Sequence, residues 1–141
     1  PTPRAQSIGP FAARLALLLH GGRDADTIDL IERSADDALL PLEGRTLRSA
    51  LKIPEAFTGA ELEGKGLAFS ALKESEDGEW IVARCVNLLD VPVDGRWRFG
   101  LPIREARLAR LNETLLEALA PEGQTVRFKA LPRAVVTILI R

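Results

Sequence analysis

Two apolar runs separated by a short polar turn constrain this chain more than any other feature. The first run covers residues 66–73, and the second, rich in β-branched residues, covers residues 80–89. The residues between them are all polar and include the pair Asp77-Gly78. This arrangement is typical of a β-hairpin. Few positions in either run are suited to face water, so we expect both strands to lie centrally in a sheet that is covered on both sides.

The composition fits a globular domain without a strongly charged partner. The length of 141 residues predicts one domain, or one domain with an extension, and the 46% that are hydrophobic can form a buried core. The 19 basic and 20 acidic residues are intermixed and leave a net charge of −1. This balance provides no basic surface for nucleic acid and no attraction to an anionic membrane.

The lack of targeting signals in the sequence favours a cytoplasmic location. No apolar run approaches the roughly 18 residues that a membrane-spanning helix needs, and no signal peptide is evident. The single cysteine excludes an internal disulfide, so nothing favours an oxidising compartment. The chain opens with Pro1-Thr2-Pro3 and contains no methionine, and we expect it to be a piece of a longer protein.

Two elements are expected before residue 41. Residues 11–20 are mostly apolar and end at a double glycine; these features favour a buried strand, although leucine and alanine also suit a short helix. A clear helix follows over residues 26–39, with Asp24 or Asp26 as its cap and Pro41 after its end. Its apolar positions recur at helical spacing, with charged residues on the other faces: Ile28, Ile31, Ala35, Ala38 and Leu39.

The sequence pattern indicates secondary structure less clearly between the helix and the hairpin. Residues 46–53 suit a strand, and Pro54, Gly59 and Gly64 then indicate a loop that leads to the hairpin. If the chain has a boundary between domains, we expect it in this stretch.

After the hairpin the chain is expected to turn and then alternate. Residues 91–95 contain a proline and an Asp-Gly pair, which predict a turn. In residues 96–99 the alternation places Trp97 and Phe99 on one face and two arginines on the other.

The last third of the chain is expected to supply further strands. Residues 103–111 favour a strand, with a helix through Glu117 as the alternative. Residues 134–140 suit a buried closing strand, and residues 124–130 alternate cleanly, with Val126, Phe128 and Ala130 pointing inward. Short strands separated by Gly/Pro turns predict a mainly β fold: an antiparallel β-sandwich with one short α-helix near the N-terminal third.

The two residues with the most reactive side chains lack the neighbours that catalysis or metal binding needs. His20 is the only histidine, which excludes any site with two of them, and no cysteine or carboxylate cluster accompanies it at metal-ligand spacing. A lone histidine at a strand end is more often a hydrogen-bonded structural residue. Cys85 lies mid-strand among apolar residues, and we expect a small buried hydrophobic side chain, not a nucleophile.

Carboxylates are numerous enough that a glycosidase-type acid/base pair has to be weighed. The candidates lie on a helix surface, in the hairpin turn and beside a proline: Asp36-Asp37, Glu76-Asp77 and Glu122. None of them stands at a strand end in apolar surroundings that would raise its pKa, so we expect solvated charges.

The tryptophans and one short motif complete the candidates. Trp80 and Trp97 could stack on a sugar ring, but both fit core positions, which is the interpretation that the pattern favours. Residues 112–114 match the N-glycosylation pattern, and without a secretion signal we take this match as accidental.

With the strands placed, several motifs resemble a known family. The run LAFSALK at residues 67–73, an acidic turn and the run IVARCVN at residues 81–87 are similar to a hairpin near the C-terminus of α-mannosidases of glycoside hydrolase family 38. Residues 106–117 and 126–140 resemble two later strands of that family, in the same order. Residues 3–20 resemble the segment that enters its large β-region. The resemblance therefore extends over nearly the whole chain.

The chain departs from this family at a few positions. Cys85-Val86 replaces the usual aliphatic-aromatic pair, and Ala134 stands where an acid is common; both departures concern local packing. The resemblance implies that residues 1–60, including the helix at 26–39, are the end of a large central β-region. It implies that residues 61–141 are a C-terminal β-sandwich domain.

The resemblance also implies a parent enzyme that hydrolyses terminal α-mannosides with retention. In that family an N-terminal α/β domain carries the aspartate nucleophile and a divalent metal, usually zinc, and none of its motifs occurs in this sequence. We therefore assign no catalytic, cofactor-binding or metal-binding residue to this chain and expect it to be inactive alone. Its expected partners are the missing catalytic domain and, for the parent, mannose-containing glycans. Apolar surface left by a missing partner would make association into a homo-oligomer a natural consequence.

Two other classes of protein remain as hypotheses. A free-standing carbohydrate-binding β-sandwich is the main alternative, and it would use Trp80 and Trp97 to hold a sugar. An immunoglobulin-like interaction domain has a suitable number of strands but lacks the Cys…Trp…Cys pattern.

Overall fold

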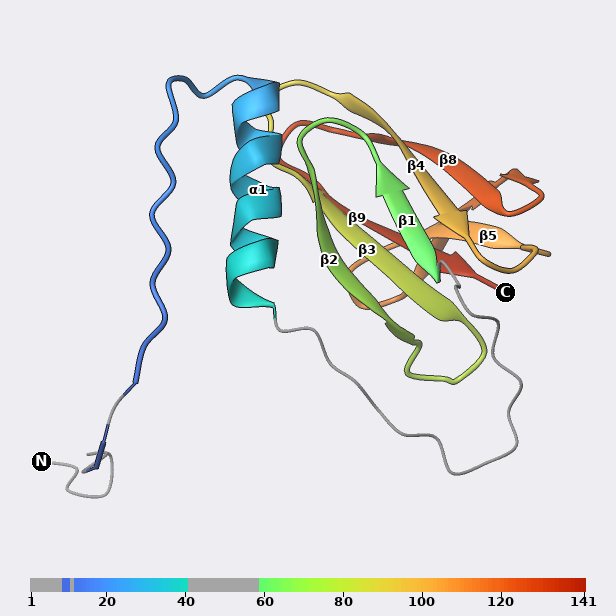
Figure 1. The fold of residues 1–141 in the computed structure, drawn as a ribbon. Coiled ribbons are helices and arrows are strands. Elements are labelled where there is room, and N and C mark those ends of the chain that lie inside the picture. Colours follow the sequence, from blue (N-terminus) through green and yellow to red (C-terminus); the bar gives the residue numbers. More distant parts are fainter. Residues whose placement is uncertain (1–8, 11, 41–58) are drawn as a thin grey trace, which may run out of the picture.

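The computed structural model describes residues 9–10, 12–40 and 59–141. Within these residues, nine strands form two antiparallel sheets that face each other as a sandwich, and one helix lies beside them (Figure 1). The predicted fold class is confirmed: the chain is mainly β, with its helix in the N-terminal third. Within the same residues, no helix combines the length and the apolar character that crossing a membrane would require.

The sandwich consists of a four-stranded and a five-stranded sheet. In spatial order, the four-stranded sheet contains β1 (Ala60–Glu63), β4 (Val93–Phe99), β8 (Thr125–Ala130) and β7 (Pro121–Glu122). The five-stranded sheet contains β2 (Leu67–Glu74), β3 (Ile81–Asn87), β9 (Val135–Ile140), β5 (Ala106–Ala109) and β6 (Leu115–Leu119). The edge strands β1 and β2, one from each sheet, adjoin each other.

The predicted hairpin is confirmed, but only one of its strands is central. β2 pairs with β3 around a turn in which Gly78 has a φ of +74°, a conformation that glycine adopts without strain. β3 also pairs with β9, whereas β2 is an edge strand and much of it is exposed. The expectation of two central strands was wrong for β2, because no other strand among the described residues pairs with its far side.

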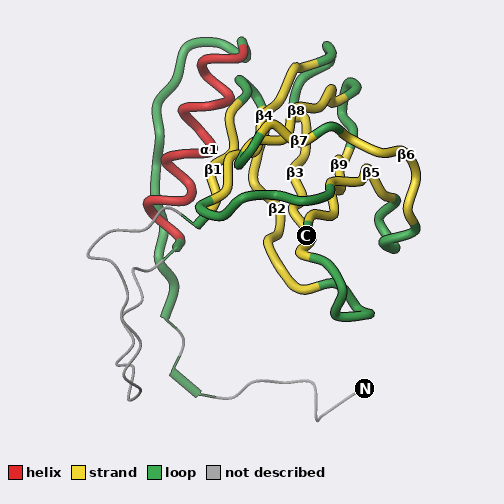
Figure 2. Tube along the Cα trace, turned by 90° about the vertical axis from the view of Figure 1, so that its right-hand side faces the viewer, coloured by secondary structure: helices red, strands yellow, loops and turns green. Residues whose placement is uncertain are grey.

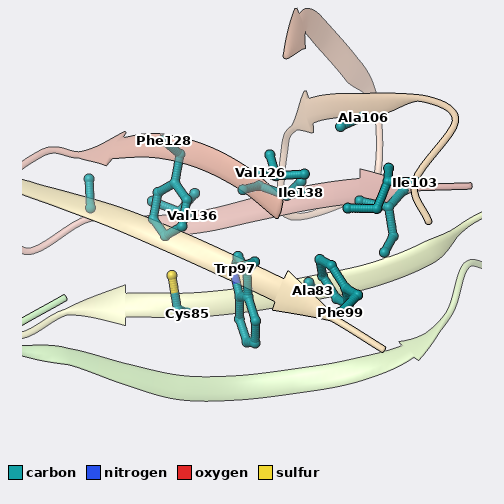
Figure 3. Packing of buried hydrophobic residues seen from close by; sticks show 12 residues of the cluster. Ala83, Cys85, Trp97, Phe99, Ile103, Ala106, Val126, Phe128, Val136 and Ile138 are labelled. Carbon is teal, nitrogen blue, oxygen red and sulfur yellow. The ribbon is translucent and has the colours of Figure 1, made fainter. Parts of the chain in front are cut away.

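The main core lies between the two sheets (Figure 3). Alternate residues of β3, β4, β8 and β9 point into it, because successive side chains of a strand face opposite sides. Trp97 is fully buried and stacks on Phe99, with ring centroids 5.8 Å apart. The inward positions predicted in residues 96–99 and 124–130, and the buried closing strand, are confirmed. The buried members of the cluster are Ala83, Cys85, Trp97, Phe99, Ile103, Ala106, Val126, Phe128, Ala130, Val136, Ile138 and Ile140.

A second cluster covers the outer face of the five-stranded sheet. The guanidinium of Arg141 lies 4.3 Å from the centroid of the Trp80 ring. The loop between β5 and β6 meets the same face, where Arg84 donates to Thr137 Oγ1 (3.1 Å) and to the Leu111 carbonyl (3.0 Å). These contacts protect the central strands on the side away from the main core. The buried members of this cluster are Trp80, Val82, Ala109 and Leu139.

Glu113 fastens the β5–β6 loop to the turn between β2 and β3. Its carboxylate accepts hydrogen bonds from Lys73 Nζ (2.5 Å) and from the Glu76 backbone N–H (2.9 Å). These two donors hold the pKa of Glu113 below its ordinary value, and Lys73 has the larger effect. Its backbone has a φ of +66°, which is uncommon outside glycine, so the contacts also offset local strain.

Strand β1 was not predicted, because its residues were expected in a loop. Its side chains explain why it forms: Glu61 pairs with Arg98 and Glu63 pairs with Arg96 across the antiparallel register with β4. Opposite charges on directly opposed residues stabilise such a pair.

Residues 91–95 were expected to form a turn, but β4 begins at Val93. A Cβ at Gly95 would lie 2.4 Å from the ring of Phe128, so this glycine serves the close approach of β8 and not a turn. The strand expected over residues 103–111 is confirmed in part as β5, and the alternative helix does not form. β6, whose leucines, alanine and glutamate also suit a helix, was missed because pairing with β5 overrides that propensity.

Helix α1 (Ala25–Leu39) confirms the predicted helix. The carboxylate of its N-cap, Asp24, accepts from the Thr27 backbone N–H at 2.8 Å, and this hydrogen bond lowers the pKa of Asp24. The helix meets the sandwich through acidic side chains: Asp29 accepts from the Gly66 N–H at 2.6 Å, and Asp26 pairs with Lys65 at 2.5 Å. No residue of α1 is fully buried.

The strand expected over residues 11–20 was wrong. Residues 12–20 form no regular structure and run alongside α1 (Figure 1, Figure 2). Among the described residues no sheet edge pairs with this segment, so its apolar pattern completes no sheet. The strand expected over residues 46–53 lies outside the described residues.

Candidate functional site

Neither His20 nor Cys85 stands in surroundings that would support catalysis. His20 is exposed in the segment beside α1, not at a strand end, and its Nδ1 lies 3.0 Å from the Gly22 carbonyl oxygen. Cys85 is buried in β3, as expected, and burial raises the pKa of its thiol to about 12. A protonated, inaccessible thiol is not a nucleophile.

The structure does not bring the candidate carboxylates together. Asp36 and Asp37 are exposed on α1, and Glu122 forms a surface ion pair with Arg127 (3.2 Å). In the hairpin turn, the Ser75 hydroxyl and the Glu79 N–H lower the pKa of Asp77. A general acid needs the opposite shift.

The tryptophans are core residues, as the pattern favoured. Trp97 is 1% exposed, and Trp80 is buried under Arg141. Neither ring can therefore receive a sugar. Asn112 of the glycosylation-like motif lies exposed in the β5–β6 loop, where its Oδ1 accepts from the Thr114 N–H (3.3 Å).

The described part of the chain contains no group of three or more histidine, cysteine or carboxylate side chains arranged to hold a metal ion. These residues therefore do not fit the zinc that the family resemblance implies for a parent enzyme, and no chemistry through a metal is assigned to them.

A groove beside α1 brings apolar and charged side chains together. It has a volume of about 440 Å³ and lies where α1 meets the edge strands β1 and β2. Its apolar part comes from both sheets: Leu62 of β1, and Leu67, Ala68 and Phe69 of β2. Its charged part comes from α1, β1 and the turn between β1 and β2: Asp29, Glu32, Arg33, Asp36, Glu61, Glu63 and Lys65.

Phe69 is the exposed aromatic residue of this groove. Although 56% exposed, its ring meets the buried Trp97 edge-on, with centroids 6.2 Å apart and planes at 74°. The register of β2 against β3 shifts between Phe69 and Ala71, which marks a β-bulge. A bulge bends its strand and redirects the side chains beside it, and such irregularities are frequent next to functional sites.

Charged side chains of the groove are held by defined partners. Arg98 Nε donates to Glu61 Oε2 at 3.0 Å, Arg96 pairs with Glu63, and Asp29 is fixed by the Gly66 N–H. The groove therefore presents oriented carboxylates close to an exposed ring. Sequence reasoning missed it, because the signal for Phe69 was only an aromatic residue in a strand that was expected to be buried.

A second hollow, of about 450 Å³, lies between the segment of residues 12–20 and α1. Ala16, Leu18 and Ala35 are among the residues that line it. On the segment, Leu15, Leu17 and Leu19 are 86–92% exposed. This combination leaves a contiguous apolar surface on the segment and the helix.

Comparison with known families gives one result. Residues 66–138 match the glycosyl hydrolases family 38 C-terminal beta sandwich domain, a stretch that runs from the start of β2 into β9. The chain has no significant match among curated proteins or solved structures.

Proposed function

Since the chain belongs to the family of glycosyl hydrolase family 38 C-terminal β-sandwich domains, we propose that it is the non-catalytic C-terminal part of a retaining α-mannosidase. The observation that carries this proposal is the match over residues 66–138, which covers the hairpin and runs into the closing strand of the sandwich. In this role the sandwich supports a catalytic domain of the same polypeptide and holds the walls of its site in place. The parent enzyme would act on mannose-containing glycans in the cytoplasm. Its catalytic domain would hold zinc.

The surface of the N-terminal part supports the proposed partner. Leu15, Leu17 and Leu19 face solvent along one side of an extended segment, and α1 buries no residue completely. An apolar surface of this kind is stabilised when another domain covers it. We assign residues 1–60 to the end of a central β-region and residues 61–141 to the C-terminal sandwich. In the absence of the partner, the same surface would favour a homo-oligomer.

The proposal is tested by activity in two polypeptides. The purified 141-residue chain is expected to show no turnover of p-nitrophenyl α-D-mannopyranoside. A polypeptide that also includes the reading frame upstream of Pro1 is expected to hydrolyse it with retention and to lose activity with a chelator. Turnover by the short chain, or an upstream frame that encodes no catalytic domain, would contradict the proposal.

The free-standing carbohydrate-binding module is the second candidate. Its two expected sugar-stacking residues, Trp80 and Trp97, are buried, so that version of the hypothesis has lost its support. A start codon directly before Pro1 would nevertheless favour an independent module over a part of an enzyme.

A further inference from the structure

The groove between α1, β1 and β2 combines an exposed ring with oriented charged groups. Its volume of about 440 Å³ falls within the range of small-molecule sites, about 300–1,000 Å³. Polar groups in such sites fix the orientation of the ligand. In this groove the charged side chains outnumber the apolar ones. We propose that this groove binds a hexose unit of a glycan, stacked on Phe69. The choice of a saccharide as the ligand rests on the proposed function.

The environment of Phe69 suits a stacking platform. An exposed phenylalanine normally loses side-chain freedom when a ligand covers it, and this loss weakens binding. Here the edge-on contact with Trp97, which itself stacks on Phe99, fixes the ring before a ligand arrives. Phe69 lies directly before the register shift of the edge strand β2, and its ring is 56% exposed. The C–H face of a pyranose ring can cover such an apolar surface.

The charged groups of the groove suit hydroxyl groups. A hydroxyl group both donates and accepts hydrogen bonds, whereas a carboxylate only accepts and a guanidinium only donates. Glu32 and Asp36 of α1 and Glu61 of β1 offer acceptors, and Arg33 offers donors. Glu61 is already oriented by Arg98. An uncharged ligand rich in hydroxyl groups can use both kinds of partner.

The groove lies between the helix and the sandwich, so a ligand in it would contact both. α1 contributes one wall, and its contacts with the sandwich include Asp29–Gly66 and Asp26–Lys65. A ligand that touches both α1 and β2 would therefore also hold the helix against the sandwich. Binding should slow amide exchange in α1 in addition to shifting the signals of β2.

The test is an NMR titration of the purified ¹⁵N-labelled chain with methyl α-D-mannopyranoside and with α-1,2-mannobiose. Shifts are expected in β1, β2 and α1 around Phe69. Phe69→Leu, which keeps an apolar side chain but removes the ring, is expected to weaken binding about tenfold, the equivalent of about 1.4 kcal/mol. Phe69→Tyr is expected to retain it, because the ring remains.

Leu116→Ala is the matched control, since Leu116 is 49% exposed on β6 at the opposite edge of the same sheet. Tryptophan fluorescence of every variant checks that the core is intact. No shift with either saccharide, or binding that Phe69→Leu leaves unchanged, would overturn the inference. If the longer polypeptide has mannosidase activity but this chain binds no saccharide, the proposed binding site is rejected and the proposed function stands. Phe69-dependent binding of methyl β-D-galactopyranoside in place of mannosides would keep the groove and count against the proposed function.

Discussion

The β-sandwich and the helix α1 differ in what holds their side chains in place. In the sandwich, two apolar clusters are closed to solvent on both sides of the five-stranded sheet. In α1, no side chain is fully buried, and its described contacts with the sandwich include an ion pair and a hydrogen bond to a carboxylate. Burial of apolar surface stabilises a fold strongly, whereas exposed ion pairs contribute little. The sandwich therefore specifies its own structure, while the helix region depends on what covers it.

Replacing Trp97 by alanine is expected to have the largest effect on the stability of the sandwich. The ring fills the centre of the core and contacts Phe69 and Phe99, so its loss should destabilise the sandwich by about 3–5 kcal/mol. Urea unfolding followed by circular dichroism measures the change. Ile81→Ala, at an exposed position of β3, is the control and should cost much less. Equal effects of the two substitutions would contradict the assignment of the core.

Gly95→Ala is expected to have the next largest effect. A Cβ at Gly95 would lie 2.4 Å from the Phe128 ring and 2.7 Å from the Leu67 side chain, so the two sheets or the ring must shift. Overpacking of this kind costs about 1–3 kcal/mol. Gly21→Ala, where a new Cβ meets nothing within 4 Å, should leave the unfolding midpoint unchanged. A stable Gly95→Ala protein would mean that β4 and β8 approach less closely than described.

The contribution of Glu113 is expected to depend on pH. Its pKa is lowered by Lys73 and by the Glu76 N–H, so the ionised form stabilises the folded state. This stabilisation is present above the ordinary carboxyl pKa of 4.5 and is lost as the pH falls through the lowered value. The difference in unfolding free energy between the wild type and Glu113→Gln should therefore shrink as the pH is lowered from 7 to 3. Glu117→Gln, at an exposed position of β6, serves as the control, and a difference that grew in acid would be the wrong sign.

Asp29→Ala is expected to have the smallest effect on global stability and a local effect on α1. The substitution removes the acceptor for the Gly66 N–H but raises helix propensity, so faster exchange would reflect lost docking and not a weaker helix. Hydrogen exchange should accelerate in α1 and stay unchanged in β9. Asp37→Ala, at an exposed position of the same helix, provides the comparison. Unchanged exchange in α1 would show that other contacts hold it.

The parts of the fold that the sequence predicted are those that local pattern determines. Strand β8 alternates cleanly, β9 is a run of β-branched and aliphatic residues, and α1 has a cap and a helical period. The parts that it missed depend on partners distant in the chain. β6 is a strand because β5 pairs with it, and the segment of residues 12–20 is not one because no described strand does.

The candidate groove could not be predicted for a related reason. Its exposed ring follows from two facts that spacing does not contain: β2 is an edge strand, and its register shifts after Phe69. The interior roles of Trp80, Trp97 and Cys85 were predictable, because each lies at an apolar position of an alternating or β-branched run.

The buried Cys85 can serve as a probe of how often the sandwich opens. The thiol is inaccessible, and its raised pKa keeps it protonated at neutral pH, so a maleimide or disulfide reagent reaches a reactive sulfur only when β3 separates from β4. As the chain contains a single cysteine, the labelling rate counts openings of one defined place in the core. The same arrangement keeps the folded chain from forming covalent pairs in an oxidising solution, whatever surface its copies share.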